Sequence, residues 1–464
     1  MTDSAAVALW SYFALAIGVS IKRGYLSESA LEFAVAGFLL LWFAVLRAYR
    51  PRSSSPDKER HYELLYAGLL GLAFFQWRTD PAWHPVAPPY VEPCQQLGAL
   101  GVVGVLLHAL LPDRFRRVGL WVVMIAALVV WGLGVHYDPH PQIDLWQLQQ
   151  GASDHLLHGR NPYSHAISNS SQGGMFGYRI DHYDYLPLNL LLGLPAYLLG
   201  RDYRYSLVAC MFIIVVVIRV VGRRLQVAPR AVDLITMAFL LHPMHGFCMI
   251  QGWAEPMLLG AVALFVYFSV RAPGGVGQSV ALFAVPMMKP YFMAPMLAFV
   301  PTLRPRWRSL LVATLAAAAT VVPFLIWNFR ATVEYGLLFT LQKIPFRADS
   351  LSIPAWLNQQ YHWQCGKTPA LVAQLATGAI CFLLLRRRGL AGFLLLSATS
   401  LYASFLAGSQ AFTNYYFFVG GLLILSALVL AAPPDEPAHA ERSAKRGVEA
   451  RPSTGSGRAD TIDN

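Results

Sequence analysis

The chain has 464 residues, of which 56% are hydrophobic, 13% are aromatic and only 13% are charged, and its formal net charge is +11. Ordinary soluble domains carry about 25% charged residues, so this composition excludes a typical soluble protein and indicates a polytopic membrane protein. The basic residues lie in short clusters between apolar runs, where they act as topology signals and contact lipid headgroups. We therefore expect membrane lipids as partners and no nucleic acid.

Apolar runs suited to crossing a membrane recur along almost the whole chain. A membrane helix needs about 20 consecutive apolar residues. Runs near that length, some of them short, lie at residues 5–21, 30–46, 62–77, 97–111, 118–135, 186–200, 205–222, 232–250, 254–270, 279–302, 309–327, 369–385, 389–407 and 411–432. We therefore expect an all-α polytopic membrane protein with about 12–14 transmembrane helices in a single domain over residues 1–432.

The distribution of Lys and Arg predicts the orientation of these helices. Short basic clusters mark cytoplasmic loops, and such clusters lie at 47–60, 113–117, 304–308 and 386–388. The tail 433–464 is rich in Pro, Ala and charged residues, which predicts a disordered cytoplasmic segment. With the N-terminus inside, the long loops face outward, and they are the main loop 136–184, a second loop 328–368 and a shorter one at 78–96.

For two apolar runs in the middle of the chain, the flanking residues do not fit a single crossing of the membrane. Basic residues flank the run 205–222 on both sides, at 201–204 and 223–224. In the run 279–302 several prolines surround Lys289, and prolines free backbone groups that the bilayer core cannot satisfy. This second segment is either a re-entrant pair of half-helices with Lys289 at its tip or one kinked helix whose lysine reaches the interface.

The main outward loop contains the polar stretch HPQIDLWQLQQGASDHLLHGRNPYSH, residues 140–165. Its apolar residues recur at three- and four-residue spacing, as on one face of a surface helix, and they are Leu145, Leu148, Ala152 and Leu156. Gly159 would end this helix. Asp144 stands at its start, so its carboxylate is either an N-cap or a reactive group at the membrane boundary.

Five segments, in order along residues 144–420, resemble motifs of the GT-C superfamily of membrane glycosyltransferases. DLWQLQQGASDHLLHGRNPY (144–163) is similar to their first outward loop, with an Asp, a surface helix and an Asn-Pro-Tyr. The others are YDYLPLNLLLGLPAYLLG (183–200), HPMHGFCMIQGWAEPMLLGAVALFVYFS (242–269), ALFAVPMMKPYFMAPML (281–297) and GSQAFTNYYFFVG (408–420). The series most resembles glycosyltransferase family 87, the polyprenyl-phosphate-mannose-dependent mannosyltransferases, and its neighbours.

This resemblance implies transfer of a sugar, mannose in that family, from a polyprenyl-phosphate donor to a lipid or glycan acceptor on the non-cytoplasmic face. Asp144 matches the general base that deprotonates the acceptor hydroxyl. Lys289 is the first candidate for stabilising the leaving phosphate, because an intramembrane lysine is costly and normally functional; Arg160 and Arg179 are further candidates. We expect a multi-pass protein of a bacterial inner membrane that uses no cofactor, with a divalent cation near Asp144 as the alternative.

Further polar residues are candidates for holding the substrates. Together with the three cations they are Asn161, Tyr163, Tyr183, Asp184, Gln251, Glu255, Asn414 and Tyr415. Glu255 follows Gln251 at a spacing of four, so the two share a helical face, and Glu255 could bind the acceptor or pair with Lys289. The other readings stay open: an aromatic belt for Tyr183 and a helix cap for Asn414.

Asp154 and the nearby histidines offer other chemistry for the same surface helix. Asp154 is an alternative base, ten residues after Asp144 in the sequence. His155 and His158 share a helical face, but the spacing fixes no third ligand, so we expect no metal site.

A transporter or flippase of lipid-linked sugars is the alternative function. It would share the hydrophobic composition, the broken helices and the intramembrane lysine. Transporters place their key polar residues near the membrane midplane, whereas here they concentrate in an outward surface helix, so the sequence favours a glycosyltransferase.

Overall fold

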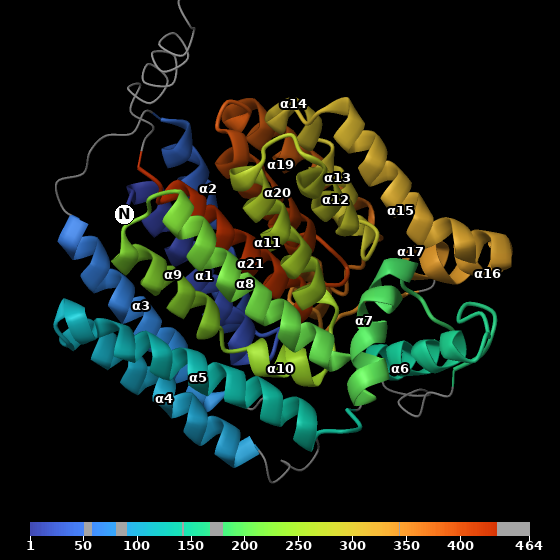
Figure 1. Cartoon of the computed structure of the whole chain (residues 1–464), viewed down its shortest axis with the longest axis horizontal. Helices are drawn as coiled ribbons and strands as arrows, with labels where there is room; N and C mark the ends of the chain where they lie inside the picture. Colours follow the sequence, from blue (N-terminus) through green and yellow to red (C-terminus); the bar gives the residue numbers. More distant parts are fainter. Residues whose placement is uncertain (51–57, 80–90, 142, 168–179, 343, 434–464) are drawn as a thin grey trace, which may run out of the picture. The chain divides into compact units, whose positions relative to one another are not determined.

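A computed structural model describes residues 1–50, 58–79, 91–141, 143–167, 180–342 and 344–433 (Figure 1). The described residues form helices, and their β structure is limited to one isolated bridge between Tyr25 and Ser350. Residues Met1–Ala432 form one compact unit. The tail predicted to be disordered lies, apart from Pro433, outside the described residues.

The helices fall into three groups along the chain (Figure 1). The N-terminal group is α1 (Asp3–Ile21), α2 (Glu28–Tyr49), α3 (Lys58–Arg78), α4 (Val91–Leu110) and α5 (Asp113–Tyr137). The middle group is α6 (Asp144–Leu157), α7 (Pro187–Gly200), α8 (Arg204–Arg224), α9 (Pro229–Leu240), α10 (His245–Ile250), α11 (Glu255–Arg271), α12 (Val276–Ala284), η1 (Pro290–Phe292), α13 (Met293–Met296) and α14 (Phe299–Leu303). The C-terminal group is α15 (Trp307–Trp327), α16 (Phe329–Val333), η2 (Glu334–Leu338), α17 (Phe339–Gln342), α18 (Ile353–Tyr361), α19 (Thr368–Leu385), α20 (Gly389–Leu406) and α21 (Thr413–Leu430).

Nine helices in the described part of the chain are long and apolar enough to cross a membrane. They are α1, α2, α4, α5, α8, α15, α19, α20 and α21. The sequence gives about 12–14 apolar runs of the length that spans a bilayer. The difference arises because several runs fold as shorter helices, such as α9 with 12 residues and α11 with 17. The all-helical polytopic architecture itself agrees with the expectation.

The core of this unit is built around α21, which lies in the middle of Figure 1. This helix is apolar on every side. Of its 18-residue apolar stretch, 89% is buried inside the protein, where the helix packs against α1, α11 and α20. In α15 and in α19, only 17% of the corresponding 18-residue apolar stretch is buried. A helix that is apolar all round needs either protein or lipid around it, so we assign α15 and α19 to the lipid-facing rim.

The proline-rich segment around Lys289 is re-entrant. Helix α12 ends at Ala284, and Lys289 lies in the break before η1, α13 and α14. The two ends of the segment meet, because Ser309 Oγ donates a hydrogen bond of 2.7 Å to the carbonyl of Gly274. The chain therefore enters and leaves at the same end of the molecule. This arrangement places Arg271 and the basic cluster 304–308 on one side. The segment 279–302 therefore does not cross the membrane, and both basic groups agree with the positive-inside rule.

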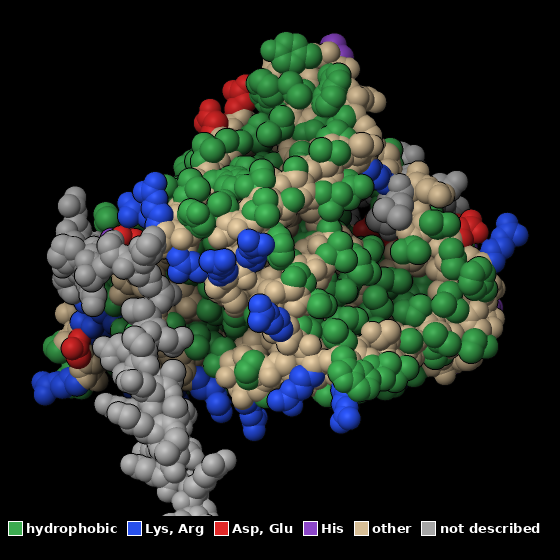
Figure 2. Space-filling view, turned by 90° about the horizontal axis from the view of Figure 1, so that it is seen from above, with side chains coloured by type: hydrophobic (Ala, Val, Ile, Leu, Met, Phe, Trp, Pro, Cys, Tyr) green, Lys and Arg blue, Asp and Glu red, His purple; other side chains and the backbone are tan. Residues whose placement is uncertain are grey.

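The run 205–222 also has basic residues on both sides, but Arg204 is not a loop residue. It is fully buried at the start of α8 and pairs with Asp202, so it forms part of the protein interior. The basic clusters at 47–60 and 386–388 do meet, since Arg388 Nη2 donates to the carbonyls of Tyr49 and Arg50. Figure 2, which views the molecule from above, shows many Lys and Arg side chains on a largely hydrophobic face.

Candidate functional site

The predicted surface helix is present as α6, Asp144–Leu157, and it ends before Gly159, whose φ is +68°. Leu145, Leu148 and Ala152 are buried on one face, as their spacing predicts. Ile143 occupies the N-cap position and Asp144 is the first helical residue. The Asp144 carboxylate therefore does not cap the helix from outside, although its Oδ1 accepts a 2.7 Å hydrogen bond from the Leu145 N–H.

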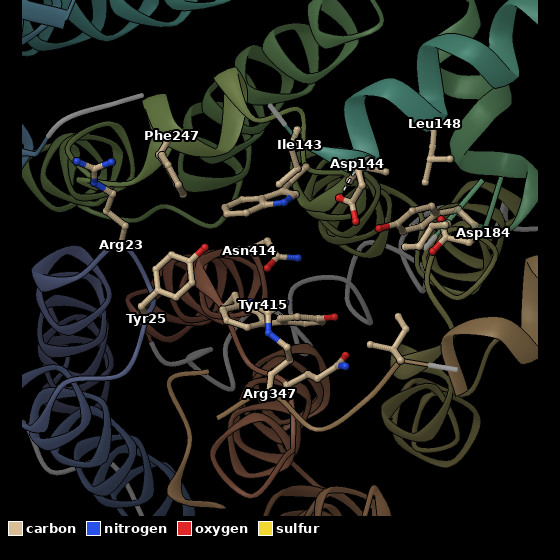
Figure 3. Close-up of a pocket in the computed structure, with 17 residues that line it drawn as sticks. Arg23, Tyr25, Ile143, Asp144, Leu148, Asp184, Phe247, Arg347, Asn414 and Tyr415 are labelled. Atoms are coloured by element: carbon tan, nitrogen blue, oxygen red, sulfur yellow. Dashed lines mark hydrogen bonds between the residues drawn. The ribbon is translucent and has the colours of Figure 1, made fainter. Parts of the chain in front are cut away.

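A cavity opens where α6 begins (Figure 3). Its space is about 870 Å³, including the part open to solvent. Segments far apart in the sequence contribute to its wall: the α1–α2 connection, the start of α6, the residues before α7, the loop after 343 and the start of α21. The polar and aromatic lining residues are Arg23, Tyr25, Asp144, Asp184, Tyr185, Phe247, Trp253, Arg347, Gln410, Phe412, Asn414 and Tyr415.

Two carboxylates, Asp144 and Asp184, lie on the same side of this cavity (Figure 3). Asp184 is only 6% exposed, and within the described residues its Oδ1 has no hydrogen-bond partner. Burial, and after it the charge of Asp144, raises the pKa of Asp184 to about 8. Burial also raises the pKa of Asp144, but the Leu145 N–H and Arg347 oppose this shift. Of the two carboxyls, Asp144 therefore has neighbours, the Leu145 N–H and Arg347, that favour its ionised form.

Two guanidinium groups, those of Arg23 and Arg347, line the cavity, and neither was predicted from the sequence. Asp349 holds Arg347 through two hydrogen bonds of 2.8 and 2.6 Å. The guanidinium also lies over the ring of Phe412, 4.6 Å from its centroid. An arginine fixed in this way offers an oriented positive charge to an anion in the cavity.

The predicted residues on α11, the re-entrant segment and α21 form an ion-pair network behind the cavity. Lys289 Nζ lies 2.6 Å from Glu255 Oε1, and Asn414 Nδ2 donates to the same oxygen at 2.9 Å. Lys289 Nζ also lies 5.3 Å from the ring centroids of Tyr185 and Tyr415, which line the cavity. Glu255 thus balances the charge of Lys289, so this lysine reaches the cavity only through its aromatic neighbours.

Gln251 lies one helical turn before Glu255, in the bend between α10 and α11. Its side chain is fully buried, and neither amide atom has a hydrogen-bond partner among the residues described. Glu255, Lys289, Asn414 and Tyr415 are therefore linked by direct contacts, and Gln251 lies one helical turn before Glu255.

Residues of the Asn-Pro-Tyr segment support the cavity and do not line it. Tyr163 is buried, and its hydroxyl donates to the Tyr185 carbonyl at 2.6 Å. Asn161 Oδ1 accepts from the Tyr163 N–H at 2.8 Å and fixes the turn. Tyr183 is also buried, and its hydroxyl donates to Gln149 Oε1 at 2.9 Å. These contacts hold the backbone of residues 183–185, which places Asp184 and Tyr185 in the cavity wall.

The remaining candidates lie away from the cavity or outside the described residues. Arg160 pairs with Asp154 at 3.0 Å on the exposed side of α6, and both side chains are more than 40% exposed. Asp154 also accepts from His158, so nothing directs it toward the cavity. Arg179 lies outside the described residues. No group of three His, Cys, Asp or Glu side chains that could hold a metal ion occurs in the part of the chain that the structure describes.

No family model matches this chain, and no curated protein matches it. Among solved structures, the chain is similar to ArnT from Cupriavidus metallidurans, crystallised with bound undecaprenyl phosphate. The TM-score is 0.45 and the sequence identity is 14%, with 72% of this chain and 64% of that chain covered. The chain thus spans less than two thirds of the ArnT length.

Proposed function

We propose that this chain is an integral membrane glycosyltransferase of the GT-C type. It transfers a sugar from a polyprenyl-phosphate donor to a lipid or glycan acceptor at the non-cytoplasmic face of a bacterial inner membrane. One observation carries this proposal. A cavity at the end of a bundle of membrane helices combines a carboxylate that can act as a base, Asp144, with the guanidinium groups of Arg23 and Arg347, which can bind a phosphate.

Asp144 is proposed as the general base. It removes the proton from the acceptor hydroxyl, and the acceptor oxygen forms a bond to the anomeric carbon of the sugar. The bond from that carbon to the phosphate oxygen breaks, and the electron pair leaves with the polyprenyl phosphate. This step needs one ionised carboxylate only, and the Leu145 N–H and Arg347 favour the ionised form of Asp144.

Arg347 is the best-placed group to stabilise the departing phosphate, with Arg23 beside it in the lining. A guanidinium held by Asp349 and Phe412 needs little reorganisation when negative charge develops on the phosphate. Lys289 was the first candidate from the sequence. Its ion pair with Glu255 makes a supporting role more plausible, in which it adds positive potential behind Tyr185 and Tyr415.

The distribution of charge supports the outward orientation in this proposal. Arg388 lies against Tyr49 and Arg50, so two of the basic clusters expected to be cytoplasmic share one end. Helix α21 leads from the cavity at its start to Leu430, whose carbonyl accepts from Thr2 near the chain start. The cavity lies at the other end of α21, and the positive-inside rule supports an outward position for it.

A transporter or flippase of lipid-linked sugars is the second candidate. The buried pair of Lys289 and Glu255 in a broken helix favours it, because transporters bind substrates at such places. The open cavity with Asp144 favours the transferase, since transport needs no base at the membrane surface. Mannose is proposed as the sugar on the family 87 resemblance alone.

The test uses the purified full chain in nanodiscs, with radiolabelled polyprenyl-phosphate mannose, glucose and arabinose and an envelope-lipid extract as the acceptor source. We expect label from one donor to enter a new product with the wild type and with Asp154→Asn, and not with Asp144→Asn. Folded protein that transfers from none of the donors, yet moves a fluorescent lipid-linked sugar across proteoliposomes, would establish the transporter instead.

A further inference from the structure

A second hollow lies at the end of the helix bundle opposite the cavity, between the start of α1, the end of α2 and the start of α3. Its space is about 580 Å³, including the part open to the surroundings. This end is identified by Thr2, whose hydroxyl donates to the carbonyl of Leu430, at the end of α21 away from the cavity. We call this hollow the inner groove. Its lining residues are Asp3, Ala6, Val7, Trp10, Phe43, Arg47, His61 and Leu64.

The walls of the inner groove are apolar and open to lipid. Asp3 and Trp10 lie seven steps apart along α1, which corresponds to about 10 Å of helix, so the groove runs from a charged mouth into the hydrocarbon region. Phe43 of α2 and Leu64 of α3 line it and are 45% and 46% exposed. This apolar part is filled by a hydrocarbon chain, because water would find few polar partners there.

The mouth of the inner groove has one titratable side chain from each of the three helices: Asp3, Arg47 and His61. Asp3 Oδ2 lies 3.6 Å from Arg47 Nη1, and Asp3 Oδ1 lies 3.8 Å from His61 Nε2. Direct charge-assisted hydrogen bonds measure about 2.7–2.9 Å, so both pairs are held apart. Within the described residues, Asp3 Oδ1 and His61 Nδ1 have no hydrogen-bond partner. The side chains of Asp3 and Arg47 are 28% and 44% exposed, so a ligand can reach both.

A ligand that complements this mouth carries both signs of charge. Arg47 suits a phosphate, and its guanidinium lies over the ring of Phe43, 5.1 Å from the centroid. Asp3 suits a cation that donates hydrogen bonds, and it repels a lipid whose only charge is negative. A phosphoethanolamine headgroup has both a phosphate and an ammonium with three N–H donors. Phosphatidylcholine has no such donor, and phosphatidylglycerol has no cation.

We propose that the inner groove binds one molecule of phosphatidylethanolamine. The phosphate lies at Arg47 and His61, and the ammonium lies at Asp3. One acyl chain follows the groove past Trp10 and Phe43. Such a lipid joins α1, α2 and α3 at one end of the bundle and should stabilise the folded protein. The site is separate from the cavity, so the proposal does not depend on the reaction proposed there.

The experiment is native mass spectrometry of the full chain in detergent, titrated with phosphatidylethanolamine, phosphatidylcholine or phosphatidylglycerol of identical acyl chains. We expect one phosphatidylethanolamine to bind about tenfold more tightly than either other lipid, since a hydrogen bond between charged groups has an effect of this size. N-methylated phosphatidylethanolamines should bind more weakly with each added methyl group, because each removes one N–H donor. Phosphatidylethanolamine should also raise the Tm of the wild type more than the other two lipids do.

Substitutions at the mouth test whether this lipid binds in the inner groove. Asp3→Asn should remove the preference for phosphatidylethanolamine over phosphatidylglycerol, and Arg47→Gln should weaken the binding of both lipids. Asp113→Asn is the matched control, because Asp113 also lies in the first turn of a helix, α5, but is 86% exposed and pairs with Arg116. This control should bind all three lipids as the wild type does. Arg47→Gln serves alone if Asp3→Asn fails to fold.

Four results would overturn the proposal. Equal binding of the three lipids would show a non-selective hydrophobic groove. Tighter binding of phosphatidylglycerol would show a site for anionic lipid. A preference for phosphatidylethanolamine that survives in both mouth variants would place the lipid elsewhere on the protein. Loss of the preference in Asp113→Asn as well would show a general effect of surface charge.

Discussion

Two charged clusters are buried in the protein, and they differ in how completely their polar groups are paired. In the closed cluster, Arg204 donates to both oxygens of Asp202 at 2.6–3.1 Å. It also donates to the carbonyls of Val135, Asp138 and Ile250, at 3.1, 2.6 and 2.8 Å. These bonds tie α5, α8 and α10 together and leave the guanidinium little capacity for a ligand.

The open cluster consists of Gln251, Glu255, Lys289 and Asn414. Within the described residues, Glu255 Oε2 and both amide atoms of Gln251 lack partners. A buried polar group without a partner costs about 1–3 kcal/mol, which selection for stability alone would remove. The comparison teaches that the closed cluster is fully paired and supports the structure, whereas the open cluster, whose Asn414 lines the cavity, keeps buried polar atoms without partners among the described residues.

The largest effect on sugar transfer is expected from a substitution of Asp144, which lines the cavity next to the open cluster. Asp144→Asn should lower kcat/KM for sugar transfer by about 10³-fold or more, because the amide cannot accept the acceptor proton. Stability should be unchanged, since the side chain bonds only its neighbouring backbone N–H among described groups. The kinetics are measured in nanodiscs beside Asp154→Asn, which should behave as the wild type. Equal loss in both variants would contradict the assignment of the base.

The closed cluster should respond in the opposite way. Arg204→Met leaves Asp202 and three carbonyls without their donor, so the free energy of unfolding should fall by about 3–5 kcal/mol. Unfolding by SDS in mixed micelles measures this change. The protein that stays folded should keep its KM for the donor. A folded Arg204→Met variant of full stability that had lost activity would place Arg204 in the site and remove the distinction between the clusters.

A double substitution tests the open cluster. Lys289→Met alone leaves the Glu255 carboxylate buried without its cation and should lower the free energy of unfolding by more than 1 kcal/mol. Glu255→Gln added to it removes that charge, so stability should recover while transfer stays impaired. The same SDS titration and transfer assay give both quantities. Recovery of both stability and activity would mean that the pair is structural.

The pH dependence should show the second carboxylate. The folded-state pKa of Asp184 is about 8, above the ordinary value of about 4. Between these two values the folded protein binds more protons than the unfolded chain, so the contribution of Asp184 to stability falls as the pH rises from about 4 to about 8. Above pH 8 its charge also repels a phosphate, and kcat/KM should decline.

Asp184→Asn is the matched variant for this pH dependence, because an amide keeps the shape of the protonated carboxyl. It should flatten the stability profile between about pH 4 and pH 8 and weaken the alkaline decline in kcat/KM. SDS unfolding and initial rates across this range measure the two effects. An unchanged alkaline decline in the variant would assign it to another group.

The sequence predicts local features of the fold, and it does not predict side chains whose role depends on distant segments. The spacing of Leu145, Leu148 and Ala152 predicts α6, and Gly159 predicts its end, because both follow from helix geometry. The resemblance brings together Glu255, Lys289 and Asn414, which the structure joins in one network. Arg347 was missed, since its role depends on Asp349, Phe412 and the meeting of distant segments. The only sequence signal was an arginine in an outward loop that carries few basic residues.

The smallest effect is expected in the support of the cavity wall. Tyr163→Phe removes the hydrogen bond to the Tyr185 carbonyl and should cost about 0.5–1.5 kcal/mol of stability. Because this bond positions the residue next to Asp184, kcat should fall by less than about tenfold while the KM for the donor stays close to the wild-type value. Tyr183→Phe, which loses the bond to Gln149 on the same segment, is the matched comparison. A large rise in the donor KM for Tyr163→Phe alone would mean that Tyr163 contacts the substrate directly and that the Asn-Pro-Tyr segment belongs to the site and not to its support.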